Sequence, residues 1–304
     1  MVSFTSRLLA VAVGVAAFAG LGDALPHRLP SFSKRQATGA LTDTDILQFA
    51  LTLEHLEATF YAQGFARFPD SDFAALGLTP DQIVALKKVG ETEATHVTVL
   101  SDVISKIPAV PVQPCTYNFG FTTAANMVAT ARILEAVGVS AYLGAAPLVT
   151  SKDVLAAAAS IVTVEARHQT FILGASGELP IPQAFDAALG PLSVFTLAAA
   201  FIESCPEGSN LPFTAFPSLV IINAGSIKAG TPLKLADPNI PSAKFCAFTA
   251  GGVGTVFRPL ESGSCAVPEG LAGEVYVQLT TTGEGNKLDE TTVVAGPAVV
   301  AIAP

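Results

Sequence analysis

The chain has 304 residues, of which half are hydrophobic and 13% are charged, and its formal net charge is −9. An acidic chain without a cluster of Lys and Arg is a poor candidate for nucleic-acid binding, so we expect no nucleic-acid partner. The length allows one large domain or two ordinary ones with a sizeable core.

The N-terminus, residues 1–24, has the pattern of a secretory signal peptide. Arg7 precedes an apolar run of about a dozen residues, and small residues follow it. This run is too short to cross a bilayer well; the alternative is an N-terminal anchor helix. Residues 25–40 are expected to be a pro-region or linker, in which Lys34-Arg35 is either a dibasic processing site or a pair of linker charges. We expect a secreted protein, extracellular or in the cell wall, with no membrane span.

Helices are predicted from residue 41 to residue 206, and together they predict an up-down four-helix bundle plus a fifth helix. The first, 41–68, opens with Thr42 as N-cap and Asp45 three positions later. The second, 78–106, opens with Thr79 as N-cap and Pro80 at its first helical position. A proline-rich segment, 107–115, ends this helix. The remaining helices are predicted over 123–146, over 152–176 with Ser151 as N-cap, and over 183–205.

The composition changes after the helices, and residues 213–304 are predicted to form a small antiparallel β-sandwich. Short apolar runs are separated by turn residues, as in "SLVIINA", "PLKLA", "KFCAFTA", "GTVFRPL", "EVYVQLT" and "TVVAGPAVVAIA". The expected fold class is therefore mainly α, with a helical bundle followed by a separate β domain.

The cysteines predict disulfide bonds, because an even number in an exported chain without a CxxC pair favours them. They are Cys115, Cys205, Cys246 and Cys265. Of the three possible pairings, order and spacing favour Cys115–Cys205 and Cys246–Cys265. The second bond would join neighbouring strands. No N-glycosylation sequon is present.

Two of the predicted helices carry a Glu and a His three positions apart, Glu93 with His96 and Glu165 with His168. Residues three apart in a helix lie on one face. No other ionisable residue lies between Asp153 and Glu165 in the fourth helix. A lone buried carboxylate is unfavourable unless it is paired or bound to metal, so Glu165 is expected to have a partner on another helix.

The first and third helices each carry a Glu with a Tyr seven residues later, Glu54 with Tyr61 and Glu135 with Tyr142. Seven residues make about two helical turns, so each pair shares a face. The first four helices therefore run Glu–Tyr, Glu–His, Glu–Tyr, Glu–His. This order indicates internal duplication of a two-helix unit.

Single Glu residues on two helices, with Glu-x-x-His on two others, are the ligands of carboxylate-bridged di-metal bundles. On these residues, 41–205 resembles the ferritin-like superfamily. The resemblance is to the secreted fungal ferritin-like proteins linked to stress response and late sexual development. The β-rich C-terminal part, residues 213–304, also resembles the C-terminal tails of those proteins.

The resemblance implies a set of metal ligands: Glu54, Glu93, His96, Glu135, Glu165 and His168. Glu93 and Glu165 would bridge two ions, the other two carboxylates would be terminal, and each His would bind one ion. The resemblance also places Tyr61 and Tyr142 in the catalytic site, as hydrogen-bond donors that hold the carboxylates.

Some neighbouring residues leave alternatives open. Glu57 could replace Glu54 or add to it, whereas Glu91 is expected to be solvated and His55 to lie at the surface or beside the ligands. The alternative for the whole cluster is a set of buried Glu–His and Glu–Arg hydrogen bonds around Arg132 and Arg167, without metal.

Such ligands imply two Fe or Mn ions as cofactors, and they also accept Zn. Three classes of function follow. The first is a di-metal oxidoreductase acting on O2 or peroxide, of the ferroxidase, peroxidase, catalase or oxygenase type. The second is iron storage in a closed cage. The third is a structural stress or cell-wall protein with a vestigial or purely structural metal site, whose C-terminal domain contacts the cell wall.

An interface is also expected, because the third and fifth helices have more apolar surface than one bundle buries. A homodimer would cover this surface, and docking of the β domain would serve equally well.

Overall fold

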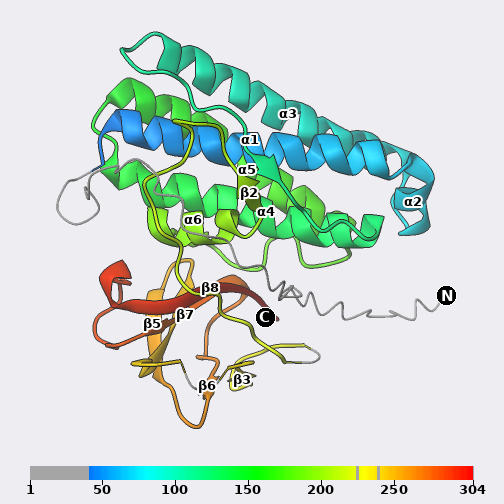
Figure 1. Cartoon of the computed structure of the whole chain (residues 1–304). Helices are drawn as coiled ribbons and strands as arrows, with labels where there is room; N and C mark the ends of the chain where they lie inside the picture. The colour runs from blue at the N-terminus through cyan, green and yellow to red at the C-terminus, as the bar shows by residue number, and fades with distance from the viewer. Residues whose placement is uncertain (1–40, 224–225, 238–239, 304) are drawn as a thin grey trace, which may run out of the picture.

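The structure is a computed structural model that describes residues 41–223, 226–237 and 240–303. The predicted signal peptide and processing site lie outside these residues. A helical bundle is followed by a smaller domain of antiparallel β-sheets (Figure 1), which confirms the predicted fold class.

The helices are α1 (Asp43–Arg67), α2 (Asp70–Ala75), α3 (Pro80–Ser105), α4 (Ala124–Ala145), α5 (Lys152–Ala175) and α6 (Pro191–Ala199). The strands are β1 (Thr116–Tyr117), β2 (Ile202–Ser204), β3 (Pro232–Lys234), β4 (Phe245–Ala250), β5 (Gly254–Pro259), β6 (Ser264–Ala266), β7 (Gly273–Thr280) and β8 (Val293–Ile302). Single 3₁₀ turns lie at Ala146–Leu148 and Glu290–Thr292.

Side-chain caps fix where the long helices begin, as the sequence predicts. The Thr42 hydroxyl accepts from the backbone N–H of Asp45, whose carboxylate accepts from the backbone of Thr42 in return. Thr79 and Gln82 form the same capping box on α3, and Ser151 caps α5. These bonds satisfy backbone donors that the first helical turn leaves free.

The four long helices do not simply alternate in direction, because a crossover separates the second from the third. Residues 106–123 run along α1: the Gln48 side chain donates to the carbonyl of Val110 at 2.7 Å, and further on Phe121 packs against Phe68, near the other end of α1, with a centroid distance of 6.1 Å. The chain thus enters α4 at the end of the bundle opposite to the one where it left α3. The expectation of a simple up-down bundle is wrong on this point; the single long crossover is the ferritin-like arrangement.

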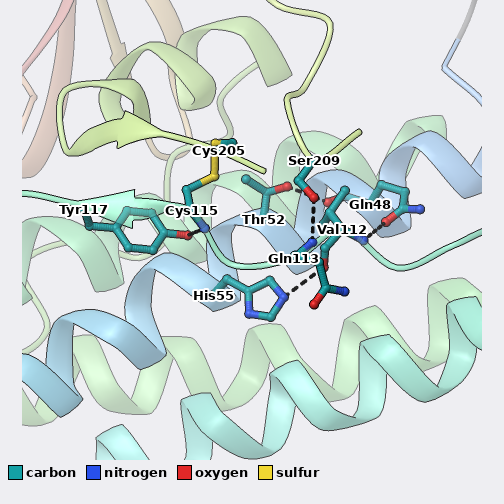
Figure 2. Close-up of a disulfide and its surroundings, with 9 residues drawn as sticks. All are labelled: Gln48, Thr52, His55, Val112, Gln113, Cys115, Tyr117, Cys205 and Ser209. Carbon is teal, nitrogen blue, oxygen red and sulfur yellow. Dashed lines mark hydrogen bonds between the residues drawn. A yellow bond between two sulfur atoms is a disulfide. The ribbon is translucent and has the colours of Figure 1, made fainter. Parts of the chain in front are cut away.

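The Cys115–Cys205 disulfide fastens this crossover to the segment after α6 (Figure 2), and the predicted pairing is confirmed. Nearby, the Ser209 hydroxyl accepts from the backbone N–H of Gln113 at 2.8 Å. Strands β1 and β2 pair at the same place. A segment without helical structure is therefore held by covalent and backbone bonds.

The predicted fifth helix, 183–205, is wrong in length: only α6 is helical there. Pro191 cannot lie inside a helix because it lacks an N–H, and it therefore occupies the first helical position. The residues before it are extended, and the backbone N–H of Leu189 donates to the carbonyl of Ser140 at 3.1 Å. Gly144 permits this contact, since a Cβ there would lie 1.7 Å from the Leu189 carbonyl oxygen.

The β domain contains a four-stranded antiparallel sheet, in the order β5-β4-β7-β8, and a two-stranded sheet of β3 and β6. The predicted Cys246–Cys265 bond is present. This bond joins β4 to β6, which belong to different sheets. The prediction that it joins neighbouring strands is therefore wrong. The predicted run 218–224 forms only an isolated bridge, from Ile221 to Leu235, among its described residues.

Strand β7 is buried on both faces, because one face packs in the β core and the other faces the helices. Val275, Val277 and Leu279 belong to the β core. On the other face, the Tyr276 hydroxyl donates to the carbonyl of Ala136 on α4 at 2.9 Å. The Gln278 amide donates to the Ser193 hydroxyl on α6 at 3.0 Å. The β domain thus docks on α4 and α6, which covers apolar helix surface; the homodimer stays a prediction.

Within the described part of the chain, one helical stretch, Ala124–Leu148, is long and apolar enough to cross a membrane by length and composition. Of its most apolar window, 67% is buried inside the protein. A core helix of a folded domain has the same properties.

Candidate metal centre

The structure brings the six predicted ligands together inside the bundle. Glu54 comes from α1, Glu93 and His96 from α3, Glu135 from α4, and Glu165 and His168 from α5. All of them are buried, and none is more than 8% exposed.

These residues form two overlapping groups, each with ligand atoms within 4.8 Å of one another. The groups are Glu54, Glu93, His96 and Glu165, and Glu93, Glu135, Glu165 and His168. Each group contains one His and one carboxylate of its own. Glu93 and Glu165 belong to both, so the cluster could hold metal ions at two adjacent positions.

Both histidines point their Nδ1 atoms at the carboxylates. His96 Nδ1 lies 3.2 Å from Glu54 Oε2 and 3.1 Å from Glu93 Oε2. His168 Nδ1 lies 2.7 Å from Glu93 Oε1 and 3.1 Å from Glu135 Oε2. Each ring therefore presents one nitrogen to the place where an ion would bind.

The two tyrosines donate across the bundle rather than along their own helices. The Tyr142 hydroxyl of α4 donates to Glu54 Oε1 of α1 at 2.5 Å. In return, the Tyr61 hydroxyl of α1 donates to Glu135 Oε1 of α4. Each terminal carboxylate thus has one oxygen held by a tyrosine, while its other oxygen faces a histidine.

The shared carboxylates have buried oxygens without hydrogen bonds. Within the described residues, Glu93 Oε1 and both oxygens of Glu165 make none. Two of these oxygens lie within ion-pairing distance of a histidine, Glu93 Oε1 of His168 and Glu165 Oε1 of His96. Glu165 Oε2 has neither kind of partner among the described residues. Buried oxygens without hydrogen bonds are unfavourable, and divalent ions would satisfy them. Carboxylates and imidazoles are donors that Fe, Mn and Zn accept, so the residues present fit such ions.

The cluster carries strongly shifted pKa values. Burial raises the pKa of Glu54 to about 7, against the opposing effect of its bond to His96. Burial opposes charge on Glu93 as well, but its close contacts with the rings of His168 and His96 prevail and lower its pKa to about 2. Burial likewise disfavours charge on the histidines, yet their carboxylate partners raise the pKa of His96 to about 12 and that of His168 to about 10. Without ions, protons on both rings offset part of the carboxylate charge, and the raised pKa of carboxyl groups such as Glu54 favours protons on these groups as well.

Glu57 is a further buried carboxylate beside the cluster, 4% exposed. It lies outside the two ligand groups, which contain Glu54, and Glu54 makes the contacts with His96 and Tyr142. Burial, followed by the charge of Glu165, raises the pKa of Glu57 well above its usual value.

Gly138 of α4 leaves the space into which Glu57 extends. A Cβ at Gly138 would lie 2.7 Å from Glu165 Oε2 and 3.2 Å from Glu57 Oε1. Gly138 follows Glu135 by three positions, as Glu57 follows Glu54. The helix pair of α1 and α3 and the pair of α4 and α5 therefore differ here.

Thr92 also contacts the cluster, although no pattern in the sequence indicates this contact. Its hydroxyl lies 2.9 Å from His168 Nε2 and 2.6 Å from the carbonyl of Val89. Since the hydroxyl has a single proton to donate to a carbonyl, it accepts from Nε2–H of His168. This bond leaves Nδ1 of that ring unprotonated when an ion is bound. The contact runs between α3 and α5, so spacing within one helix could not reveal it.

The remaining candidates lie outside the cluster. Glu91 is exposed and pairs with Lys88 at 2.8 Å, as expected. The His55 ring is half-buried, and its Nε2 atom lies 3.1 Å from the carbonyl oxygen of Val112, a residue of the crossover (Figure 2).

The arginines do not explain the cluster. Arg132 pairs with Glu178 at 2.6 Å and with Glu274 of β7 at 3.3 Å. Arg167 is exposed, and its guanidinium donates to the Thr163 hydroxyl at 3.2 Å. The alternative of buried Glu–Arg bonds around these two residues is therefore wrong, while the Glu–His contacts it also proposed are present.

Comparison with known proteins agrees with this geometry. The family model of the ferritin-like domain matches residues 42–178, so the helical part of the chain is a ferritin-like domain. The chain is 25% identical over 182 residues to Protein rds1 of the fungus Schizosaccharomyces pombe, an alignment that covers 60% of this chain and 44% of that protein. The predicted resemblance to fungal ferritin-like proteins is thus confirmed, over less than half the length of this relative.

Among solved structures, a conserved hypothetical protein from Mycobacterium tuberculosis is similar with a TM-score of 0.37 and 21% identity. The similarity covers 47% of this chain and 96% of that one. A likeness of this size adds nothing to the assignment.

Proposed function

We propose that the cluster is a di-metal centre that binds two Fe or Mn ions, with Zn also acceptable. The observation that carries the proposal is the overlap of two ligand groups in Glu93 and Glu165. Glu93 Oε1 and both oxygens of Glu165 are buried and make no hydrogen bond among the described residues. Each ion would have a terminal carboxylate, one His Nδ1 and the two shared carboxylates. Four carboxylate charges match two divalent ions.

We propose redox chemistry on O2 or peroxide for this centre, of the ferroxidase, peroxidase or catalase type. Two Fe or Mn ions, when bound, would exchange electrons with O2 or peroxide, whereas Zn ions would not. The chain's own residues position the ligands: Tyr61 and Tyr142 hold the terminal carboxylates, and Thr92 orients the His168 ring. Such supporting hydrogen bonds fix ligand geometry and basicity.

The proposal is tested on the purified full chain by elemental analysis and by O2 and peroxide consumption. We expect about two ions per chain in the wild type, and loss of both the ions and the activity in Glu165→Gln. Glu91→Gln is the matched control, because Glu91 lies on α3 near Glu93 but is exposed and pairs with Lys88. Absence of bound ions and of consumption in the wild type would favour a structural protein with a vestigial site. Two retained ions and unchanged consumption in Glu165→Gln would place the active ions outside this cluster.

We also propose that the protein is secreted and acts in a stress response or in development. The two disulfides are compatible with an extracellular protein, and the role follows the resemblance to fungal ferritin-like proteins. N-terminal sequencing of protein from the culture medium tests secretion. We expect a start beyond residue 24, or near Gln36 if Lys34-Arg35 is cleaved; an intact N-terminus on cell-retained protein would contradict secretion.

A further inference from the structure

A cavity of about 210 Å³ lies at the end of the bundle where α1 and α5 begin and where α3 and α4 end. Its lining is apolar apart from Tyr142, Asp153 and Ser160. It opens to the surface, because Asp153 and Ser160 are exposed and Val99, which also lines it, is 44% exposed.

Small side chains create this space. Ala50 of α1, Ala141 and Ala145 of α4, and Ala157 and Ala158 of α5 all border the cavity. Four helices meet there with alanines where larger apolar residues would fill the gap. Interiors are normally packed with few voids larger than a water molecule, so an open space of this size is an unusual feature.

The opposite side of the cluster is packed. Tyr61 occupies the position that corresponds to Tyr142, and its ring lies 5.2 Å from Phe60 and 5.9 Å from Phe65, between centroids. Phe65 in turn packs against Phe73 at 5.8 Å. The cavity is therefore confined to the Tyr142 side of a pseudo-symmetric centre.

The buried part of the cavity offers no free polar group that the structure describes. The Tyr142 hydroxyl is used, since it donates to Glu54 Oε1 at 2.5 Å, and the other two polar residues lie at the exposed mouth. A polar ligand would lose its hydrogen bonds to water there without replacement, whereas an apolar one would gain by leaving water.

We propose that this cavity is a binding site for a small apolar molecule, about as large as two fused hydrocarbon rings. An engineered apolar cavity of about 150 Å³ binds benzene, so the larger space here suits a somewhat larger hydrocarbon. The bound molecule would lie against the Tyr142 ring, one hydrogen bond away from Glu54. That the bound molecule is a substrate of the metal centre would rest on the proposed function. The existence of the binding site does not depend on the proposed function.

Naphthalene is the probe, and its binding is measured by fluorescence on EDTA-treated full chain, which contains no tryptophan. Two variants from different helices block the cavity, Ala157→Phe on α5 and Ala50→Phe on α1. The matched control is Ala156→Phe, because Ala156 is exposed and does not border the cavity. Thermal unfolding of each variant shows that it is folded.

We expect saturable binding of about one naphthalene per chain, at least about tenfold weaker in a folded blocking variant and unchanged in Ala156→Phe. Glu165→Gln should also bind naphthalene as the wild type does, so failure of the metal centre would not affect this result. Absence of saturable binding to the wild type, or equal binding by the blocking and control variants, would overturn the proposal.

Discussion

The helix pair α1–α3 and the helix pair α4–α5 supply the same side chains to the cluster. Each pair brings one single Glu, one Glu-x-x-His and one Tyr, and each tyrosine holds the terminal carboxylate of the other pair. The surroundings of these side chains differ. Glu57 on α1 corresponds to Gly138 on α4, and Thr92 on α3 corresponds to Val164 on α5.

The packing around the two pairs differs as well. The crossover and its disulfide cover α1, while β7 covers α4. Tyr61 is packed among phenylalanines, whereas Tyr142 borders a cavity. The two helix pairs share their candidate ligands but differ in the residues around them, so the two proposed metal positions are not equivalent.

The largest effect is expected from the two carboxylates that both positions share. Glu93→Gln or Glu165→Gln should remove both ions, because each residue belongs to both ligand groups. Glu54→Gln or Glu135→Gln should leave about one ion per chain, since each terminal residue serves one position. Elemental analysis of the four variants measures this difference. Equal loss in all four would show that the ions do not bind independently at two positions.

The second prediction concerns pH and the α1 side of the cluster. Burial raises the pKa of Glu54 from 4.5 to about 7, so the folded chain holds this proton more tightly than the unfolded chain. The stabilisation is full below pH 4.5 and is lost as the pH rises to 7, by roughly 3 kcal/mol. The metal-free wild type should therefore become less stable over this range, and Glu54→Gln should change less. Urea unfolding after EDTA treatment measures both.

Bound ions should reverse this trend, because protons and metal compete for the same ligands. The stabilisation that Mn²⁺ adds should be larger at pH 7 than at pH 5. Identical pH profiles for metal-free wild type and Glu54→Gln would contradict the assignment of the titration to Glu54.

The third prediction sharpens the comparison of Thr92 with Val164. Thr92→Val removes the hydroxyl that holds His168 Nε2, so metal affinity at one position should fall by about ten- to a hundredfold. Thr95→Val is the control, because Thr95 is exposed on the same helix and bonds only the carbonyl of Glu91 among the described residues. Calorimetric titration with Mn²⁺ should show one weakened position. Two equally weakened positions would mean that Thr92 supports the fold rather than one ligand.

The smallest effect is expected at Gly138. A methyl group there would crowd Glu165 and Glu57, and such overpacking should lower metal affinity by about tenfold. Gly174→Ala on α5 is the control, since the nearest atom to its added Cβ is 3.4 Å away. Alanine normally favours a helix over glycine by about 1 kcal/mol, so the control should be as stable as the wild type or more so. Unchanged Mn²⁺ affinity in Gly138→Ala would show that the space is not needed.

The sequence by itself determined the features that depend on local spacing. The caps at Thr42, Thr79 and Ser151 were predictable, because a capping side chain bonds backbone atoms three residues away. The Glu–His and Glu–Tyr pairs were predictable for a similar reason, since a helix places residues three and seven apart on one face. Burial of Glu165 in an apolar helix then required partners, and the other helices carried them.

Only the tertiary structure decided which side chains meet across helices. The crossover along α1 set the direction of α4, so Tyr142 reaches Glu54 and Tyr61 reaches Glu135. Thr92, Gly138 and the cavity depend on how α3, α4 and α5 pack, and a short polar or small residue has no periodic signal in the sequence. Such contacts join residues far apart in the chain, and packing of whole helices fixes their distances, which local helix geometry does not contain.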